Sequence, residues 1–265
     1  VGASNNKDVE DWADFRDDLS LDGITDEISN KNQYYCELTG IYWLWKHCKD
    51  EVVGICHYRR FFTTNREFCT DLSNVIDEKL VAKILEENDI ILPPIHNFRL
   101  PVFHYSLRIY DEKEALIVNE MRNIIQQKYP SYLHEFDNVN RSYQSYVWNM
   151  MICKKKLFDS YCDWLFNILF ELENRLTFDW EKMDVAQKRL YGYLSERLLT
   201  VWVLKNKLKI YECDVMFTEE DRSLKGQIQK WLHYKTKYIS SNSVFSKINT
   251  IYDRRGYSNK FMKRR

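Results

Sequence analysis

The stretch GICHYRRFF places a histidine, a tyrosine and two arginines directly after an apolar run. That run, residues 52–56, predicts a strand, so His57, Tyr58, Arg59 and Arg60 lie at its carboxyl end, where open α/β sheets bind ligands. Because side chains alternate along an extended chain, we expect His57 and Arg59 to point together into one crevice. The planar guanidinium fork suits the oxygens of a diphosphate, although such arginines also commonly pair with carboxylates on the protein itself.

Carboxylates in the second half of the chain could act as an acid or a base. Glu196 follows two tyrosines and precedes Arg197 in the helical stretch RLYGYLSERLL, and Asp184 comes shortly before this stretch. A carboxylate in such a setting could deprotonate a substrate hydroxyl or anchor the substrate. Glutamate and arginine neighbours on a helix are more often a solvated face, so the spacing leaves both interpretations open.

A further set of polar residues interrupts an aromatic segment, ISNKNQYYCELTGIYWLWKHC. Ser29 is a suitable N-cap, and apolar residues recur at three- and four-residue steps, which predicts one amphipathic helix. Asn32 and Glu37 lie among its tyrosines, an arrangement that often forms a site for sugar hydroxyls. A capped surface helix with an aromatic core face would have the same pattern.

The elements that must position these residues alternate between helix and short strand. We expect helices in SNVIDEKLVAKILEEN, with Ser73 as N-cap, in residues 111–128, in LFDSYCDWLFNILFELENRL and in KRLYGYLSERLLTVWVLKN, and a short one near residues 9–17. We expect further strands in DIILPP, SYVWNMMICKKKLF and LKIYECDVMF. Helix followed by strand, twice, predicts an α/β layer with parallel pairing.

The charge of the chain is balanced overall but uneven along its length. With 39 basic and 39 acidic residues, net charge gives no reason to expect a nucleic acid partner. Residues 222–265 carry twelve Lys or Arg and one acid, however, which suits contact with anionic lipid or another polyanion. Seven cysteines lack any zinc-ligand spacing, which is typical of reduced thiols in a cytosolic protein, and we expect no metal site.

Together, the aromatic segment, VVGICHYRRFF, DIILPP, WNMMICKKKLFDSYCDWLFNILFELE and RLYGYLSERLLTVWVL resemble a bacterial family of capsular and exopolysaccharide glycosyltransferases. This family was long catalogued as a domain of unknown function, and some members are assigned as galactofuranosyltransferases. The blocks extend in order from about residue 22 to 215. The resemblance implies an α/β, GT-A-like nucleotide-sugar-binding sandwich over residues 1–221, followed by a basic helical or coil segment at 222–265.

The resemblance also implies roles for the residues above. In ordinary GT-A enzymes an acidic D-x-D motif holds a metal on the diphosphate, and here His57, Tyr58, Arg59 and Arg60 occupy that place, so that cations would replace the metal. Asn149 would line the acceptor site, together with Met150. Glu196 would be the general base of an inverting displacement and Asp184 the second choice. Independently of the resemblance, Asn32, Glu37 and Arg197 are further candidates for binding substrate.

The activity implied is transfer of a sugar, galactofuranose among the candidates, from a UDP-sugar to a lipid-linked cell-surface polysaccharide. The donor is a substrate, and no cofactor is expected. The protein would be cytoplasmic, with its basic segment in peripheral contact with the inner face of the membrane. Family members usually carry a strand before a segment ending in VGA, at which this chain starts, so we expect that strand to be missing. The alternative is a non-catalytic carbohydrate- or polyanion-binding module.

Overall fold

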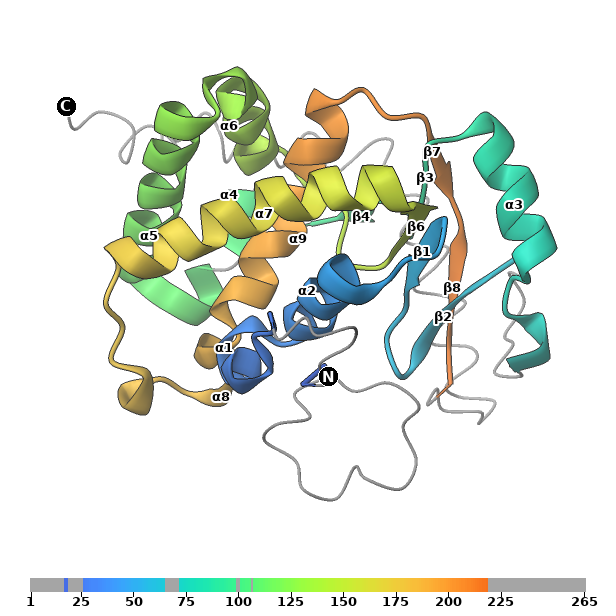
Figure 1. The fold of residues 1–265 in the computed structure, drawn as a ribbon. Helices are drawn as coiled ribbons and strands as arrows, with labels where there is room; N and C mark the ends of the chain where they lie inside the picture. The colour runs from blue at the N-terminus through green and yellow to red at the C-terminus, as the bar shows by residue number, and fades with distance from the viewer. Residues whose placement is uncertain (1–16, 19–25, 65–71, 99–100, 106, 219–265) are drawn as a thin grey trace, which may run out of the picture.

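The computed structural model describes residues 17–18, 26–64, 72–98, 101–105 and 107–218 (Figure 1). In these residues the protein is a mixed α/β fold, in which helices alternate with short strands along the chain and the strands form small sheets. The helix expected near residues 9–17 falls almost wholly outside this part, as do the proposed boundary at residue 221 and the basic segment 222–265. No helix in the described ranges is both long and apolar enough to cross a membrane.

The central sheet has the strand order β1-β6-β3-β7. These strands are β1 (Val52–Ile55), β6 (Met151–Lys154), β3 (Ile90–Leu92) and β7 (Ile210–Glu212). The expected parallel pairing of β1 with β3 is wrong, because β6 lies between them and is antiparallel to both. Strand β3 pairs in parallel with β7 instead. The continuous apolar run of β6 suits this inner position, whereas β1 alternates between exposed and buried residues, as an edge strand does.

The inner strands of the central sheet are covered on both faces, because alternate residues of β3 and β6 join different apolar clusters. Ile90 and Leu92 pack into the larger cluster with α2 (Leu38–His47), α7 (Lys155–Arg175) and α9 (Leu190–Lys205). Ile91 packs into a smaller cluster with α3 (Glu78–Glu87), β2 (Arg60–Thr63) and β8 (Asp214–Phe217). Figure 1 shows the sheet between α7 on one side and α3 on the other.

Shorter elements complete the described fold. Antiparallel pairs join β2 to β8 and β4 (His96–Asn97) to β5 (Gln144–Ser145). The remaining helices are α1 (Asn32–Tyr35), α4 (Val102–Tyr105), α5 (Leu107–Lys128), α6 (Leu133–Arg141) and α8 (Val185–Lys188). Single 3-10 turns occupy Ser29–Lys31, Leu72–Asn74, Pro130–Tyr132 and Trp180–Lys182. The last predicted strand is therefore two strands, β7 and β8, on either side of Cys213.

Two of the predicted helix N-caps, Ser29 and Ser73, do not cap a helix. Ser29 does not cap a helix: it is buried, and its hydroxyl donates to Asp17 at 3.3 Å. Helix α3 begins at Glu78 rather than near Ser73, because Asp77 accepts a hydrogen bond from the Leu80 N–H at 2.8 Å. The aromatic segment is also not one helix, since it breaks at Cys36, whose φ is 52°.

Candidate functional site

The residues HYRR form a tight turn between β1 and β2. The His57 N–H donates to the Arg60 carbonyl and the Arg60 N–H donates to the His57 carbonyl, both at 3.2 Å. Residues paired in this way across a hairpin place their side chains on the same side. The expectation that His57 and Arg59 face together is therefore wrong, because it assumed an extended chain where the backbone reverses.

The turn separates its four side chains into an inner and an outer pair. His57 bonds through Nε2 to the Trp148 carbonyl at 2.6 Å, and the Arg60 guanidinium lies 4.9 Å from the centre of the Trp148 ring. Tyr58 is 75% exposed at the tip, where the Arg59 guanidinium lies 4.4 Å from its ring. Of the two arginines, Arg60 is the one that faces the interior of the molecule.

The inner pair contacts a second turn, which precedes β6 and holds two carboxylates. Trp148 and Asn149 have φ values of 76° and 51°, so both are left-handed. The Trp148 N–H donates to Glu196 Oε1 at 2.8 Å, and the Asn149 amide donates to Glu37 Oε1 at 2.7 Å. Glu196 from α9 and Glu37 from the break between α1 and α2 are thus bound by adjacent residues.

Asn149 itself lies in the interior and is surrounded by polar partners. Its side chain is fully buried. Besides Glu37, its amide nitrogen reaches the Gly192 carbonyl at 3.2 Å, and its oxygen lies 3.0 Å from the Ser195 hydroxyl. The residue predicted to line an acceptor site is therefore in place to orient a carboxylate.

Close packing of α9 against the break at Cys36 brings the two carboxylates to the same region. A Cβ added to Gly192 would lie 3.5 Å from the Cys36 Cβ and 3.8 Å from Glu37 Oε2. These are ordinary van der Waals distances, so α9 packs directly against this junction. The left-handed Cys36 in turn ends α1 just before Glu37.

The Glu196 carboxyl has the most unusual ionisation of the cluster. Burial raises its pKa to about 8, and the negative charge of Glu37 acts in the same direction. The Trp148 N–H, Arg189 and Arg60 lower the pKa in opposition. Burial also lowers the pKa of Arg60, against the effect of Glu196 and Glu37. A carboxyl group that titrates near neutral pH beside cations can exchange a proton with a bound hydroxyl.

Other predicted residues have visible local partners. Asp184 is exposed and caps α8, accepting from the Gln187 N–H at 2.8 Å. Asn32 donates to the Cys36 carbonyl at 2.9 Å and so supports the break before Glu37. Arg197 is buried and donates to the Val102 carbonyl at 3.1 Å. Arg197 and Glu196 also line one hollow of about 20 Å³, room for about one water molecule.

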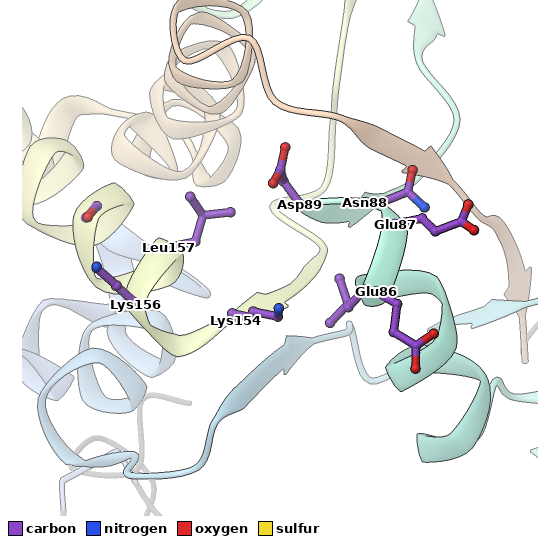
Figure 2. Close-up of a pocket in the computed structure, with 9 residues that line it drawn as sticks. Glu86, Glu87, Asn88, Asp89, Lys154, Lys156 and Leu157 are labelled. Carbon is purple, nitrogen blue, oxygen red and sulfur yellow. The ribbon is translucent and has the colours of Figure 1, made fainter.

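A larger hollow, of about 400 Å³, lies at the opposite end of the central sheet (Figure 2). Its lining comes from the end of α3 and the start of α7: Leu85, Glu86, Glu87, Asn88, Asp89, Lys154, Lys156, Leu157 and Ser160. The pairing of Val52 with Lys154 places it at the amino end of β1, whereas the pairing of Ile55 with Met151 places the Trp148 turn at the carboxyl end. Ligands of open α/β sheets bind at carboxyl ends, which favours the Glu196 cluster.

Several residues of the cluster are not apparent from the sequence. Asparagine tolerates a left-handed backbone, so Asn149 could be suspected of a turn, but nothing in the sequence marks Trp148 as left-handed. The contributions of Arg189, Gly192 and Ser195 depend on helix packing, which spacing does not reveal. In the part of the chain that the structure describes, no group of three or more His, Cys, Asp or Glu residues could hold a metal ion.

The chain is similar to a solved structure, to a curated protein and to a protein family. The structure is similar to the apo structure of WbbM, a bifunctional glycosyltransferase, with a TM-score of 0.63 and 28% identity over 77% of this chain and 39% of that one. A curated protein from Saccharomyces cerevisiae, "Accumulates dyads protein 4", is 26% identical over 114 residues, which are 42% of this chain. The chain spans 22% of the yeast protein's length. Residues 1–207 match the family described as "Domain of unknown function (DUF4422)", and the chain therefore belongs to this family.

Proposed function

We propose that the protein is a glycosyltransferase that uses a UDP-sugar, with Glu196 as general base. The observation that carries this proposal is the Glu196 carboxyl, whose pKa is about 8, in a cluster with Arg60 at the carboxyl end of β1. The similarity to the WbbM glycosyltransferase supports the reaction class. The same proposal includes a GT-A-like fold, in which the UDP-sugar donor binds at the carboxyl ends of β1 and β3.

The proposed reaction is an inverting displacement at the anomeric carbon. Glu196 takes the proton of an acceptor hydroxyl, whose oxygen forms the new glycosidic bond. The bond between the anomeric carbon and the diphosphate oxygen breaks, and its electron pair leaves with UDP. Arg60 would stabilise the charge that develops on the leaving diphosphate, the task that a metal ion performs in other transferases. Asp184 remains the second candidate for the base, although its carboxylate caps α8.

The assay that tests this proposal measures UDP release from a panel of UDP-sugars that includes UDP-galactofuranose, with and without a lipid-linked oligosaccharide acceptor. We expect release by the wild type and a loss of about 10²- to 10⁴-fold in Glu196→Gln, the usual contribution of a general base. Glu86→Gln, which removes an exposed carboxylate at the opposite end of the sheet, is the matched control.

The same assay can favour the alternative function, a non-catalytic carbohydrate- or polyanion-binding module. Binding of oligosaccharide without UDP release from any donor would indicate a carbohydrate-binding module. Activity that survives EDTA is expected if arginine replaces the metal, and a strict requirement for Mn²⁺ or Mg²⁺ would contradict that part of the proposal.

We further propose that the acceptor is anchored in the inner membrane and that residues 222–265 attach the protein to its cytoplasmic face. Each Lys or Arg near an anionic surface contributes about 1 kcal/mol of binding free energy. Co-sedimentation of the full chain with vesicles containing phosphatidylserine should be strong at low salt and weak at high salt. Equal recovery with neutral vesicles would refute the attachment.

A further inference from the structure

Two carboxylates that are distant in the sequence are bound by neighbouring residues of one turn. Trp148 gives its backbone N–H to Glu196, and Asn149 gives its side-chain amide to Glu37. The pair is therefore fixed in position by a single structural unit. His57 bonds to the Trp148 carbonyl and ties this unit to the turn after β1.

The contacts of Asn149 determine which way its amide points. The Gly192 carbonyl can only accept a hydrogen bond, and an ionised Glu37 can only accept as well. The NH₂ group must therefore face both of them, while the Asn149 oxygen faces the Ser195 hydroxyl. The Asn149 amide, 2.7 Å from Glu37 Oε1, therefore fixes the position of this carboxylate.

The Glu196 carboxyl accepts a hydrogen bond from the Trp148 N–H and is partly buried. The charged and titratable groups around it are Glu37 from the α1–α2 junction, Arg60 from β2, Arg189 and Tyr193 from the start of α9, and Tyr161 from α7. Among these groups, the carboxylate of Glu37 is the one whose negative charge opposes ionisation of Glu196.

We propose that Glu37 is a positioning residue rather than a ligand of the substrate: fixed in place by Asn149 beside Glu196, its carboxylate makes Glu196 a stronger proton acceptor. This inference rests on the proposed function, in which Glu196 is the base. Proton transfer is more efficient when the base has a proton affinity suited to the working pH, and a neighbouring like charge is one way to reach it.

Glu37→Gln is the variant that separates these roles. Glutamine can still accept from Asn149 through its amide oxygen, so the contact is kept while the charge is lost. We expect the acidic limb of the pH profile of kcat to move to lower pH by about one unit or more. The plateau rate should fall about three- to tenfold as the base weakens, with KM for the donor unchanged. If Glu37 binds substrate, KM will rise and the limb will not move, which would overturn the inference.

A titration that does not depend on activity completes the test. In protein labelled with ¹³C at glutamate carboxyls, the Glu196 signal should titrate at lower pH in Glu37→Gln than in the wild type and in Glu86→Gln. An unchanged Glu196 midpoint overturns the inference even if the enzyme is active. A shifted midpoint in a protein that releases no UDP upholds the coupled pair and refutes the proposed function instead.

The wild type alone supplies a second measurement in case Glu37→Gln does not fold. At pH 7 the Glu196 carboxyl should still show the chemical shift of its protonated form. A Glu196 that is already ionised at pH 7 would mean that no neighbouring charge opposes its ionisation and would overturn the inference.

Discussion

At the scale of single residues, the ionisation of Glu196 gives the account its clearest kinetic signature. If the Glu196 carboxylate accepts the proton, the rate must depend on the fraction that is ionised, and burial raises the pKa to about 8. We therefore expect kcat to rise with pH up to about 8 and then to level off. In Glu196→Gln the residual rate should lose this limb. A wild-type rate that is flat from pH 6 to 9 would rule out Glu196 as the base.

The two arginines of the HYRR turn provide a comparison between adjacent residues. Arg60 lies over Trp148 and interacts with Glu196, whereas Arg59 lies at the exposed tip beside Tyr58. A lysine at position 60 would keep the charge but lose the planar fork that bonds a diphosphate. We expect Arg60→Lys to lower the rate of UDP release about 10²-fold and Arg59→Lys to change it less than about threefold. The opposite ranking would place the diphosphate at the tip of the turn.

At the scale of secondary structure, the end of α9 offers a test that does not involve the site. Lys207 has a φ of 52°, and the bonds from Lys207 N–H to the Leu204 carbonyl and from Leu208 N–H to the Val203 carbonyl form a Schellman motif. Glycine is the usual residue there because it has no Cβ to oppose a left-handed backbone. Lys207→Gly should therefore raise the free energy of unfolding by up to about 1 kcal/mol, as measured by urea denaturation. Destabilisation by this substitution would mean that the lysine side chain supports the helix end in another way.

Secondary structure was predictable where the pattern is local. The strand predicted in SYVWNMMICKKKLF and the long helix after it are both present, although β6 is shorter than expected and α7 begins directly after it rather than after a turn. Pro130 follows the end of α5 as expected. The break at Cys36 was not predictable, because it depends on contact with α9 at Gly192. The reversal at HYRR was missed for a similar reason, since the pairing of β2 with β8 joins segments that are about 150 residues apart.

At the scale of the whole molecule, Glu196 links stability to pH. Its pKa is about 8 when folded, against an ordinary value of 4.5, so the folded protein keeps a proton that the unfolded chain loses between these pH values. The free energy of unfolding contributed by this group is therefore fully present below pH 4.5 and declines as pH rises to 8, by up to about 1.4 kcal/mol per pH unit. Glutamine at this position has no proton to lose.

Thermal denaturation at several pH values measures this linkage. The wild type should lose Tm relative to Glu196→Gln as pH rises from 5 to 8, and the difference should stop growing above pH 8. Parallel Tm curves for the two proteins would show that Glu196 ionises in the folded state as it does in the unfolded chain.

The arrangement of the whole sheet could be inferred from the sequence only in part. Alternating helices and strands correctly indicate an α/β protein, but they do not reveal that β6 enters between β1 and β3. The consequence for the site is direct, because β6 carries the Trp148–Asn149 turn at its start to the carboxyl end of β1. Glu196, Glu37 and His57 could each be suspected from residue type, whereas the turn that joins them is a product of the tertiary fold.

A structure of the protein with UDP bound would test the central claim most directly. The account predicts that the diphosphate lies against the Arg60 guanidinium at the carboxyl end of β1, with Glu196 facing the position of the transferred sugar. UDP in the hollow between α3 and α7, or a diphosphate without contact to Arg60, would contradict it.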